Sequence, residues 1–232
     1  MDAISALPPD FHGSGTIGAR LIRALAEIGA SRSFERTVET GAGRTTLLLS
    51  HLSRRHACFA MNSGGGSVDA VRASSLLRPG VVEFIDGPTQ TTLPRYAFDA
   101  PIDLALLDGP HGFPFTQMEY WCVYPHLREG ALLVVDDIHI PSVHMLYAFL
   151  RDDRMFRLVD VLEKTAIFER TDAPAVNPLG DSWWEQGYNA KHFPRRSGLP
   201  LITQAKLCVP ERLVPSLQAA REWWRSRRRG RV

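Results

Sequence analysis

Short apolar segments of strand length recur along the first two thirds of the chain, and longer segments with helical spacing of apolar residues separate them. This alternation is typical of a parallel sheet whose two faces are covered by helices. The pattern therefore predicts an α/β fold with a doubly wound sheet. We expect parallel strands over Thr37–Glu39, His56–Met61, Val81–Ile85, Ile102–Leu107 and Ala131–Val135.

The helical segments are recognised by apolar residues three and four positions apart. The first covers Ile17–Ile28, and Gly29 follows it as a stop signal. Further helices are predicted near residues 45–54, 67–77 and 115–127, and over Pro141–Leu150.

Two more strands follow the last of these helices, over Phe156–Leu162 and Thr165–Arg170. Only Glu163 and Lys164 join them, which is too short for a parallel crossover, so they must form an antiparallel hairpin. Beyond Thr171 the sequence indicates irregular structure until a final helix over about residues 210–228.

The composition is that of an ordinary soluble protein, because 44% of the 232 residues are hydrophobic and the net charge is +2. No apolar run reaches the roughly 18 residues that a membrane span needs, and the N-terminus lacks a signal pattern, so we expect a cytoplasmic protein without a membrane partner. The basic tail over Arg225–Arg231 is typical of a solvated helix end, so nucleic acid is not expected. Cys58, Cys122 and Cys208 stand among apolar neighbours and indicate core side chains.

Candidate chemistry begins at Glu39-Thr40-Gly41-Ala42-Gly43, where a strand turns sharply into a helix. Glycine allows positive φ there and lets a ligand lie against bare backbone. The free N–H groups at the helix start can donate to an anionic group. The same pattern also serves ordinary turns, so it does not define a site alone.

Polar side chains follow the other predicted parallel strands, and ligands bind at this edge of open parallel sheets. They are Asn62 and Ser63, Asp86, Asp108, and the pair Asp136 and Asp137. Carboxylates gathered at one edge repel each other unless a cation or a ligand separates them, which favours a site. The alternative is that each acid caps the turn or helix that follows it.

The glycine turn, Ile102–Gly109, Gly130–Asp137 and the closing hairpin together resemble the class I S-adenosylmethionine-dependent methyltransferases. The Leu107–Gly112 run and the Asp136-Asp137 pair look most like the small bacterial O-methyltransferase-like group, which includes metal-dependent enzymes. The resemblance implies seven strands in the order 3-2-1-4-5-7-6. We divide the chain into an N-terminal helix and lid-like loop (1–33), the methyltransferase core (34–171) and a C-terminal extension packed on the core (172–232).

The resemblance also implies cofactor contacts at matching positions. Gly41 and Gly43 would face the methionine part of S-adenosylmethionine, with Glu39 near its ammonium group. Asp86 and Gly87 would lie beside the adenine, and Asp108 would contribute to the same site. The acid that holds the ribose after the second strand in most of the family is missing, and Asn62 stands there as a weaker, neutral clamp.

The expected reaction is methyl transfer to a hydroxyl of a small molecule, a sugar or a phenol. Asp108, Asp136 and Asp137 offer oxygen ligands for Mg²⁺ or another divalent cation that would bind the acceptor. His111 and His139 are candidates for the general base. His111 is preferred because it follows the fourth strand, in the loop that faces the acceptor in the family. His111 and Asp108 are thus the candidate catalytic residues, although each histidine can also be a simple partner of a neighbouring carboxylate.

Two other interpretations stay open. A nicotinamide-dependent oxidoreductase is disfavoured because a third glycine and an acid after the second strand are missing. A non-catalytic cofactor-binding module is compatible with the fold alone. His12–Gly15 is a candidate lid, and a homo-oligomer is compatible with the sequence. An aromatic cluster in the extension either walls an acceptor pocket or anchors the segment, and it comprises Trp183, Trp184, Tyr188 and His192.

Overall fold

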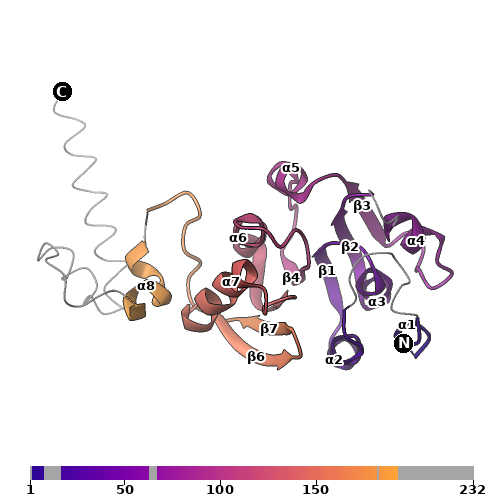
Figure 1. Ribbon diagram of the computed structural model, residues 1–232, viewed down its shortest axis with the longest axis horizontal. Coiled ribbons are helices and arrows are strands. Elements are labelled where there is room, and N and C mark those ends of the chain that lie inside the picture. Colours follow the sequence, from indigo (N-terminus) through magenta and orange to yellow (C-terminus); the bar gives the residue numbers. More distant parts are fainter. Residues whose placement is uncertain (1, 8–16, 63–66, 182, 193–232) are drawn as a thin grey trace, which may run out of the picture. The chain divides into compact units, whose positions relative to one another are not determined.

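The computed structural model describes residues 2–7, 17–62, 67–181 and 183–192. Its centre is a seven-stranded sheet with the order β3-β2-β1-β4-β5-β7-β6 (Figure 1). Strands β1 to β5 run parallel, and β7 is antiparallel to both β5 and β6. The predicted fold class and strand order are confirmed. The strands are β1 (Phe34–Thr40), β2 (Ser53–Ala60), β3 (Val82–Asp86), β4 (Ile102–Leu107), β5 (Leu127–Val135), β6 (Phe156–Leu162) and β7 (Thr165–Arg170).

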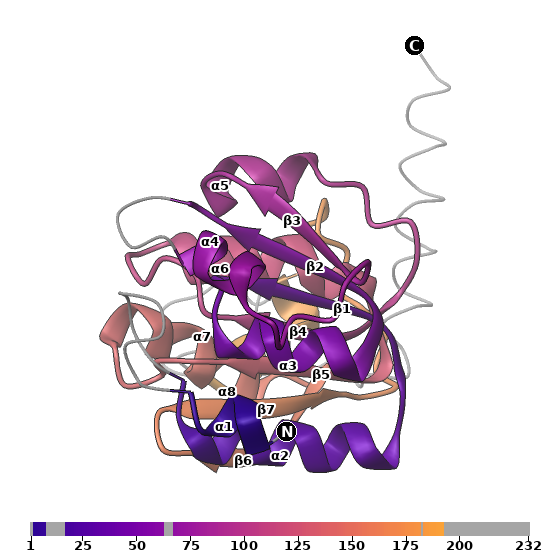
Figure 2. The same ribbon diagram turned by 90° about the vertical axis from the view of Figure 1, so that its right-hand side faces the viewer.

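Helices cover both faces of the sheet, with α2 and α3 on one side and α6 and α7 on the other (Figures 1 and 2). The helices are α1 (Asp2–Ser5), α2 (Ala19–Ser31), α3 (Arg44–Leu52), α4 (Ser67–Ala73), α5 (Thr89–Thr92), α6 (Phe115–Val123), α7 (Pro141–Asp152) and α8 (Gly187–His192). Short 3-10 turns lie at Leu93–Arg95, Tyr124–His126 and Trp183–Glu185. Within the described ranges, no helix is long and apolar enough to cross a membrane.

The central strands are buried because helices cover both faces of the sheet (Figure 1), and β4 is mostly apolar. All six residues of β4 are buried. One apolar cluster joins Leu104 and Leu106 of β4 to Leu25 of α2 and Leu48 of α3. This packing holds β1 and β4 side by side, and these two strands lead directly into the glycine turn and Asp108.

Element boundaries differ from the sequence-based expectations at several points. The helix expected near 45–54 ends at Leu52, and β2 begins at Ser53 without an intervening loop. Ser53 makes this abrupt change possible, because its hydroxyl donates a hydrogen bond of 2.6 Å to the Leu49 carbonyl at the helix end. The short helices α5 and α8 were not predicted, because four to six residues are too few to show helical spacing.

The chain divides into two compact units. Of the described residues, the first unit holds those up to 151 and 155–175 with the whole sheet, and the second holds 152–154, 176–181 and 183–192. Cys58 and Cys122 in the first unit are buried, as predicted. The packing of an extension on the core stays a prediction. His12–Gly15, Ser63, Cys208, the helix near 210–228 and the basic tail lie outside the described residues.

The second unit has polar and aromatic contacts of its own. Lys191 and His192 of α8 each lie 2.5 Å from a carboxylate oxygen of Asp152. The rings of Trp183 and Trp184 meet edge to face, with centroids 5.9 Å apart. These contacts lie within the second unit. Whether its aromatic cluster walls an acceptor pocket or anchors the segment stays a prediction.

Candidate active site

A cavity of about 520 Å³ opens at the carboxyl ends of the parallel strands, a volume within the usual range of small-molecule sites. Residues that follow β1, β2, β3, β4 and β5 all line it, together with one residue from the β6–β7 turn. The sequence-predicted site residues on its wall are Gly41, Gly87, Asp108, His111, Asp136 and Asp137. Glu39, Gly43, Asn62 and Asp86 are not among the lining residues.

The glycine turn takes the form that the sequence predicts. Gly41 has a φ of +88°, and a Cβ atom there would lie 2.6 Å from the backbone oxygen of Asp108. Gly41 is therefore required both by its backbone conformation and by the close approach of β4. Gly43 is the N-cap residue directly before α3 and does not line the cavity, and its N–H donates to the Thr46 hydroxyl at 2.9 Å.

Glu39 turns away from the cavity wall. Its side chain is fully buried, and its Oε1 atom lies 3.0 Å from His56 Nε2. The other nitrogen of His56 lies 2.8 Å from the Thr37 hydroxyl, so the acid belongs to a polar network between β1 and β2. The Glu39 carboxylate therefore helps to tie β1 to β2, and the position of Glu39 near the ammonium group stays a prediction.

Asn62 and Asp86 lie next to each other on the exposed edge beyond β2 and β3. The N–H group of Asn62 donates to Asp86 Oδ1 at 3.1 Å, which ties the ends of the two strands together. Inside the cavity, the wall near β3 is instead formed by Gly87, Thr89 and Gln90. The buried Gln90 Oε1 atom has no hydrogen-bond partner in the described part of the chain, so it is free to accept from a ligand.

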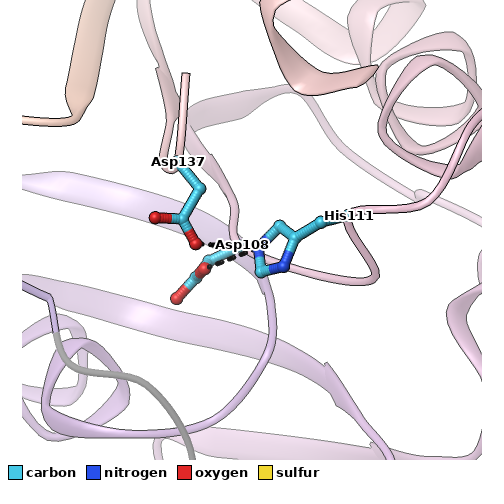
Figure 3. Close-up of side chains that lie close together, drawn as sticks. All are labelled: Asp108, His111 and Asp137. Atoms are coloured by element: carbon cyan, nitrogen blue, oxygen red, sulfur yellow. Dashed lines mark ion pairs between the residues drawn. The ribbon is translucent and has the colours of Figure 1, made fainter. Parts of the chain in front are cut away.

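Asp108, His111 and Asp137 converge on one point of the cavity (Figure 3). His111 Nε2 lies 3.1 Å from Asp137 Oδ2 and 3.6 Å from Asp108 Oδ1. The three residues come from the loops that follow β4 and β5, and their ligand atoms all lie within 4.8 Å of one another. This arrangement can hold a proton on the imidazole or a cation between the three groups.

Burial and neighbouring charges shift the protonation of this group. Burial raises the pKa of Asp108 to about 6, and the charges of Asp136 and Asp137 add to the effect while His111 opposes it. The pKa of His111 is raised, because Asp108 bonds to its protonated form and Asp137 adds a negative charge nearby. The site therefore retains a proton more readily than its isolated side chains would.

Asp136 has a different set of partners from the other two acids. It is 2% exposed, its Oδ1 atom accepts a hydrogen bond from the Thr165 hydroxyl, and its Oδ2 atom lies 3.2 Å from Lys164 Nζ. Although Asp136 lines the cavity, the group that could hold an ion joins His111, and not Asp136, to Asp108 and Asp137. His111 thus joins Asp108 and Asp137 as a candidate ligand, and the role of Asp136 as a ligand stays a prediction.

His139, the second candidate base, lies outside this group. Its Nδ1 atom is 3.7 Å from Asp137 Oδ1, and its side chain is 63% exposed. It does not line the cavity. The preference for His111 therefore has a geometric basis.

Glu119 of α6 is a buried acid behind the site that the sequence analysis did not identify. It is fully buried, and its Oε2 atom accepts a hydrogen bond of 2.9 Å from the Thr40 hydroxyl. Thr40 in turn accepts a hydrogen bond from the N–H group of Asp108 at 3.0 Å. Burial raises the pKa of Glu119 to about 7.

Lys164 and Gln90 also line the cavity, although no sequence pattern indicates them as site residues. Lys164 occupies the hairpin turn, and its only sequence signal was a position within a two-residue loop. Gln90 follows β3 by four residues in a segment without apolar periodicity. The place of Gln90 just after a parallel strand is a weak sequence signal for it, whereas the place of Lys164 follows only from the order of the strands in the sheet.

Comparison with known proteins agrees with this geometry. Residues 38–138 match the family model described as a methyltransferase domain. The match covers the glycine turn, the cavity-lining residues after β2, β3 and β4, and the Asp136-Asp137 pair. It favours methyl transfer over the oxidoreductase alternative. No curated protein matches the sequence significantly.

Several solved structures share the fold at low sequence identity. TomG, an O-methyltransferase from Streptomyces achromogenes solved with SAM, is 15% identical with a TM-score of 0.55, over 67% of this chain and 82% of TomG. Cofactor-bound Rv0187 from MTB is 19% identical with a TM-score of 0.55, over 74% of this chain and 86% of its own. An O-methyltransferase from Bacillus cereus in complex with SAH is 14% identical with a TM-score of 0.52, over 66% of this chain and 80% of its own.

Proposed function

We propose that this chain, a class I S-adenosylmethionine-dependent methyltransferase by its matched domain and strand order, methylates a hydroxyl group of a small molecule. The observation that carries the proposal is the cavity at the strand ends. One part of its wall is the bare backbone of Gly41, and another is an imidazole between two carboxylates. A ligand can thus lie against the turn while its reactive group reaches His111.

The lining residues fit S-adenosylmethionine. Gly41 and Gly87 both have positive φ, and a Cβ there would come within 2.6 Å of the Asp108 carbonyl oxygen or 3.0 Å of Thr92 Cγ2, so both turns require glycine and present backbone to the cavity. The orphaned Gln90 oxygen can accept a hydrogen bond from an amino group such as that of adenine. The three carboxylates on the wall favour a cationic ligand. When bound, the cofactor supplies an activated methyl group.

His111 is the group that we assign to proton removal from the acceptor hydroxyl. The imidazole lines the cavity and its Nε2 atom faces Asp108 and Asp137, so its other nitrogen, Nδ1, is the atom that would take the proton of an acceptor hydroxyl. The resulting positive charge is stabilised by the same two carboxylates. Asp108 and Asp137 therefore orient the base and favour its protonated form.

A divalent cation in the same group is a second candidate for the activation of the hydroxyl. Two carboxylates and one imidazole within 4.8 Å fit a first-row metal such as Mn²⁺ better than Mg²⁺, which prefers oxygen ligands alone. Asp108, His111 and Asp137 would hold the ion, which would lower the pKa of an acceptor hydroxyl. In that state Asp136 would remain bound to Thr165.

Calorimetry and a turnover assay test the proposed function. S-adenosylmethionine should release or absorb heat on binding, and the nicotinamide dinucleotides should not. With a panel of catechols and sugars, a methylated product should form at a hydroxyl oxygen. Absence of S-adenosylmethionine binding would reject the proposal, and binding without turnover of any acceptor would favour a non-catalytic module. The same assay in chelator decides whether the reaction requires a metal.

The remaining parts of the proposal concern partners and location. We propose a small-molecule acceptor, a cytoplasmic reaction, and neither a nucleic-acid nor a membrane partner. A homo-oligomer is also part of the proposal, and sedimentation velocity would test it.

A further inference from the structure

Lys164 places a positive charge against the acids of the cavity. Its Nζ atom lies 2.7 Å from Asp137 Oδ1 and 3.2 Å from Asp136 Oδ2. Lys164 also lines the cavity, and about one third of its side chain is exposed. The ammonium group is therefore at the same time part of the wall and an ion-pair partner of two site acids.

The two carboxylate oxygens of Asp137 have different partners. Oδ1 faces Lys164, whereas Oδ2 faces His111, and the carboxylate of Asp137 is one of the three groups that could hold an ion. An ammonium group and a divalent cation that share one carboxylate repel each other. The binding of any ion held by Asp108, His111 and Asp137 would therefore be weakened by Lys164 at its present position.

We propose that Lys164 is a tethered cation that competes with a divalent metal ion for Asp137, so that metal binding requires its ammonium group to move away. This inference rests on the metal site of the proposed function and adds its regulation. Without an ion, Lys164 neutralises the repulsion between Asp136 and Asp137. With an ion bound, the lysine side chain swings out along its flexible stem.

The hairpin fixes the backbone of Lys164, whereas its side chain can move. Its carbonyl oxygen accepts a hydrogen bond from the N–H group of Ile138 at 2.9 Å, which fixes the turn beside the loop that carries Asp137. The preceding Glu163 has a φ of +58°, so the two-residue turn is tight and keeps Lys164 close to this loop. The side chain can leave the acids while its backbone stays in place.

Titration of Mn²⁺ into metal-free protein tests the inference without any turnover. Lys164→Met should bind Mn²⁺ about tenfold to a hundredfold more tightly than the unaltered chain, because one nearby unit charge is removed. Lys164→Arg keeps the charge and should bind about as weakly as the unaltered chain. Lys191→Met is the matched control, because Lys191 pairs with Asp152 in the other unit and not with the site.

Isothermal calorimetry gives the affinity, and the electron paramagnetic resonance signal of free Mn²⁺ gives an independent count of bound ions. Lys164→Gln replaces Lys164→Met if the latter fails to fold by circular dichroism. If the unaltered chain binds Mn²⁺ and removal of the lysine charge leaves the affinity equal or weaker, the inference is wrong and the metal site stands. If no variant binds Mn²⁺, both the inference and the metal site are wrong, and methyl transfer in chelator would still support the proposed reaction.

Discussion

The protonation of His111 depends on the carboxylates around it. The neighbouring Asp108 carboxylate is the main cause of its raised pKa, and the charges of Asp137 and Asp136 add to the effect. A general base must be neutral to accept a proton, so activity should rise with pH as His111 loses its proton. This residue consequently links the charge of the cavity to the rate of the reaction.

The pH–rate profile provides the first prediction. The rising limb of kcat/KM should have its midpoint above 6.5, the ordinary value for histidine. Asp108→Asn should move this limb to lower pH, because it removes the largest cause of the raised pKa, although it also lowers the plateau. A limb that stays in place in Asp108→Asn would show that another group is titrating.

Gly41 provides a second prediction, because a side chain at this position would cause both backbone strain and a steric clash. Gly41→Ala would put a Cβ on a backbone with a φ of +88° and against the Asp108 carbonyl. It should lower the free energy of unfolding by about 1–3 kcal/mol and weaken S-adenosylmethionine binding. Gly80→Ala is a matched control, since φ is +75° there but no other described atom lies within 4 Å of the new Cβ. Denaturant unfolding and calorimetry measure both effects.

Gly80→Ala has the backbone strain of Gly41→Ala without a steric clash, so comparison of the two variants separates the effect of the clash from that of the strain. Gly80→Ala should cost about 1 kcal/mol and leave cofactor affinity unchanged. Equal effects of the two substitutions on affinity would contradict the role of Gly41 in the cavity wall.

At the scale of elements, Glu119 joins α6 to the ends of β1 and β4 through Thr40. The hydrogen bonds run from the Asp108 N–H to Thr40 and from Thr40 to Glu119, at 3.0 and 2.9 Å. The second oxygen of Glu119 occupies the space that a Cβ on Gly109 would need. A buried glutamate at position 119 therefore requires glycine at position 109, next to Asp108.

The raised pKa of Glu119 gives a third prediction, on stability. Its pKa is about 7 in the folded chain against an ordinary 4.5, so the folded state binds this proton more tightly than the unfolded state. The contribution of Glu119 to the free energy of unfolding should therefore increase as pH falls from about 7 to about 4.5, by up to about 3 kcal/mol. Glu119→Gln should remove this dependence.

Urea unfolding at several pH values measures the effect. The exposed Glu129→Gln serves as a control for the loss of one glutamate and should leave the pH dependence as it is. A pH dependence that persists unchanged in Glu119→Gln would contradict the assigned protonation.

The strands β4 and β5 were predictable from sequence because they are rich in apolar residues, as in Ile102–Leu107. The boundary between α3 and β2 at Ser53 was not predictable, because it is set by one hydrogen bond from the Ser53 hydroxyl to the Leu49 carbonyl. Glu119 was missed for a related reason. Its partner Thr40 is 79 positions away in the chain, so no local pattern indicates that they meet.

At the scale of the whole molecule, the cavity-lining residues among those that the structure describes extend from Gly41 to Lys164 and belong to the first compact unit. The acids at the strand ends could be located from sequence, because parallel strands bring their carboxyl ends to one edge. The ion pair between Asp136 and Lys164 could not be located from sequence, because it depends on β7 lying beside β5.

A chain that ends at Ala175 tests this division and is the fourth prediction. It keeps all seven strands, so it should unfold cooperatively and bind S-adenosylmethionine with the affinity of the full chain. Thermal unfolding and calorimetry measure the two properties. Loss of cofactor binding in a folded, truncated chain would mean that the second unit contributes to the cofactor site.

Transfer of labelled methyl groups from S-adenosylmethionine to a catechol or sugar acceptor is the most direct test of methyl transfer with His111 as base. His111→Asn should lower kcat by about 10²–10⁴-fold and leave cofactor affinity nearly unchanged, whereas His139→Asn, on the exposed side of Asp137, should retain activity. Equal activity of His111→Asn and the unaltered chain would contradict the assignment of the base. No transfer to any hydroxyl by the unaltered chain would contradict the proposed function itself.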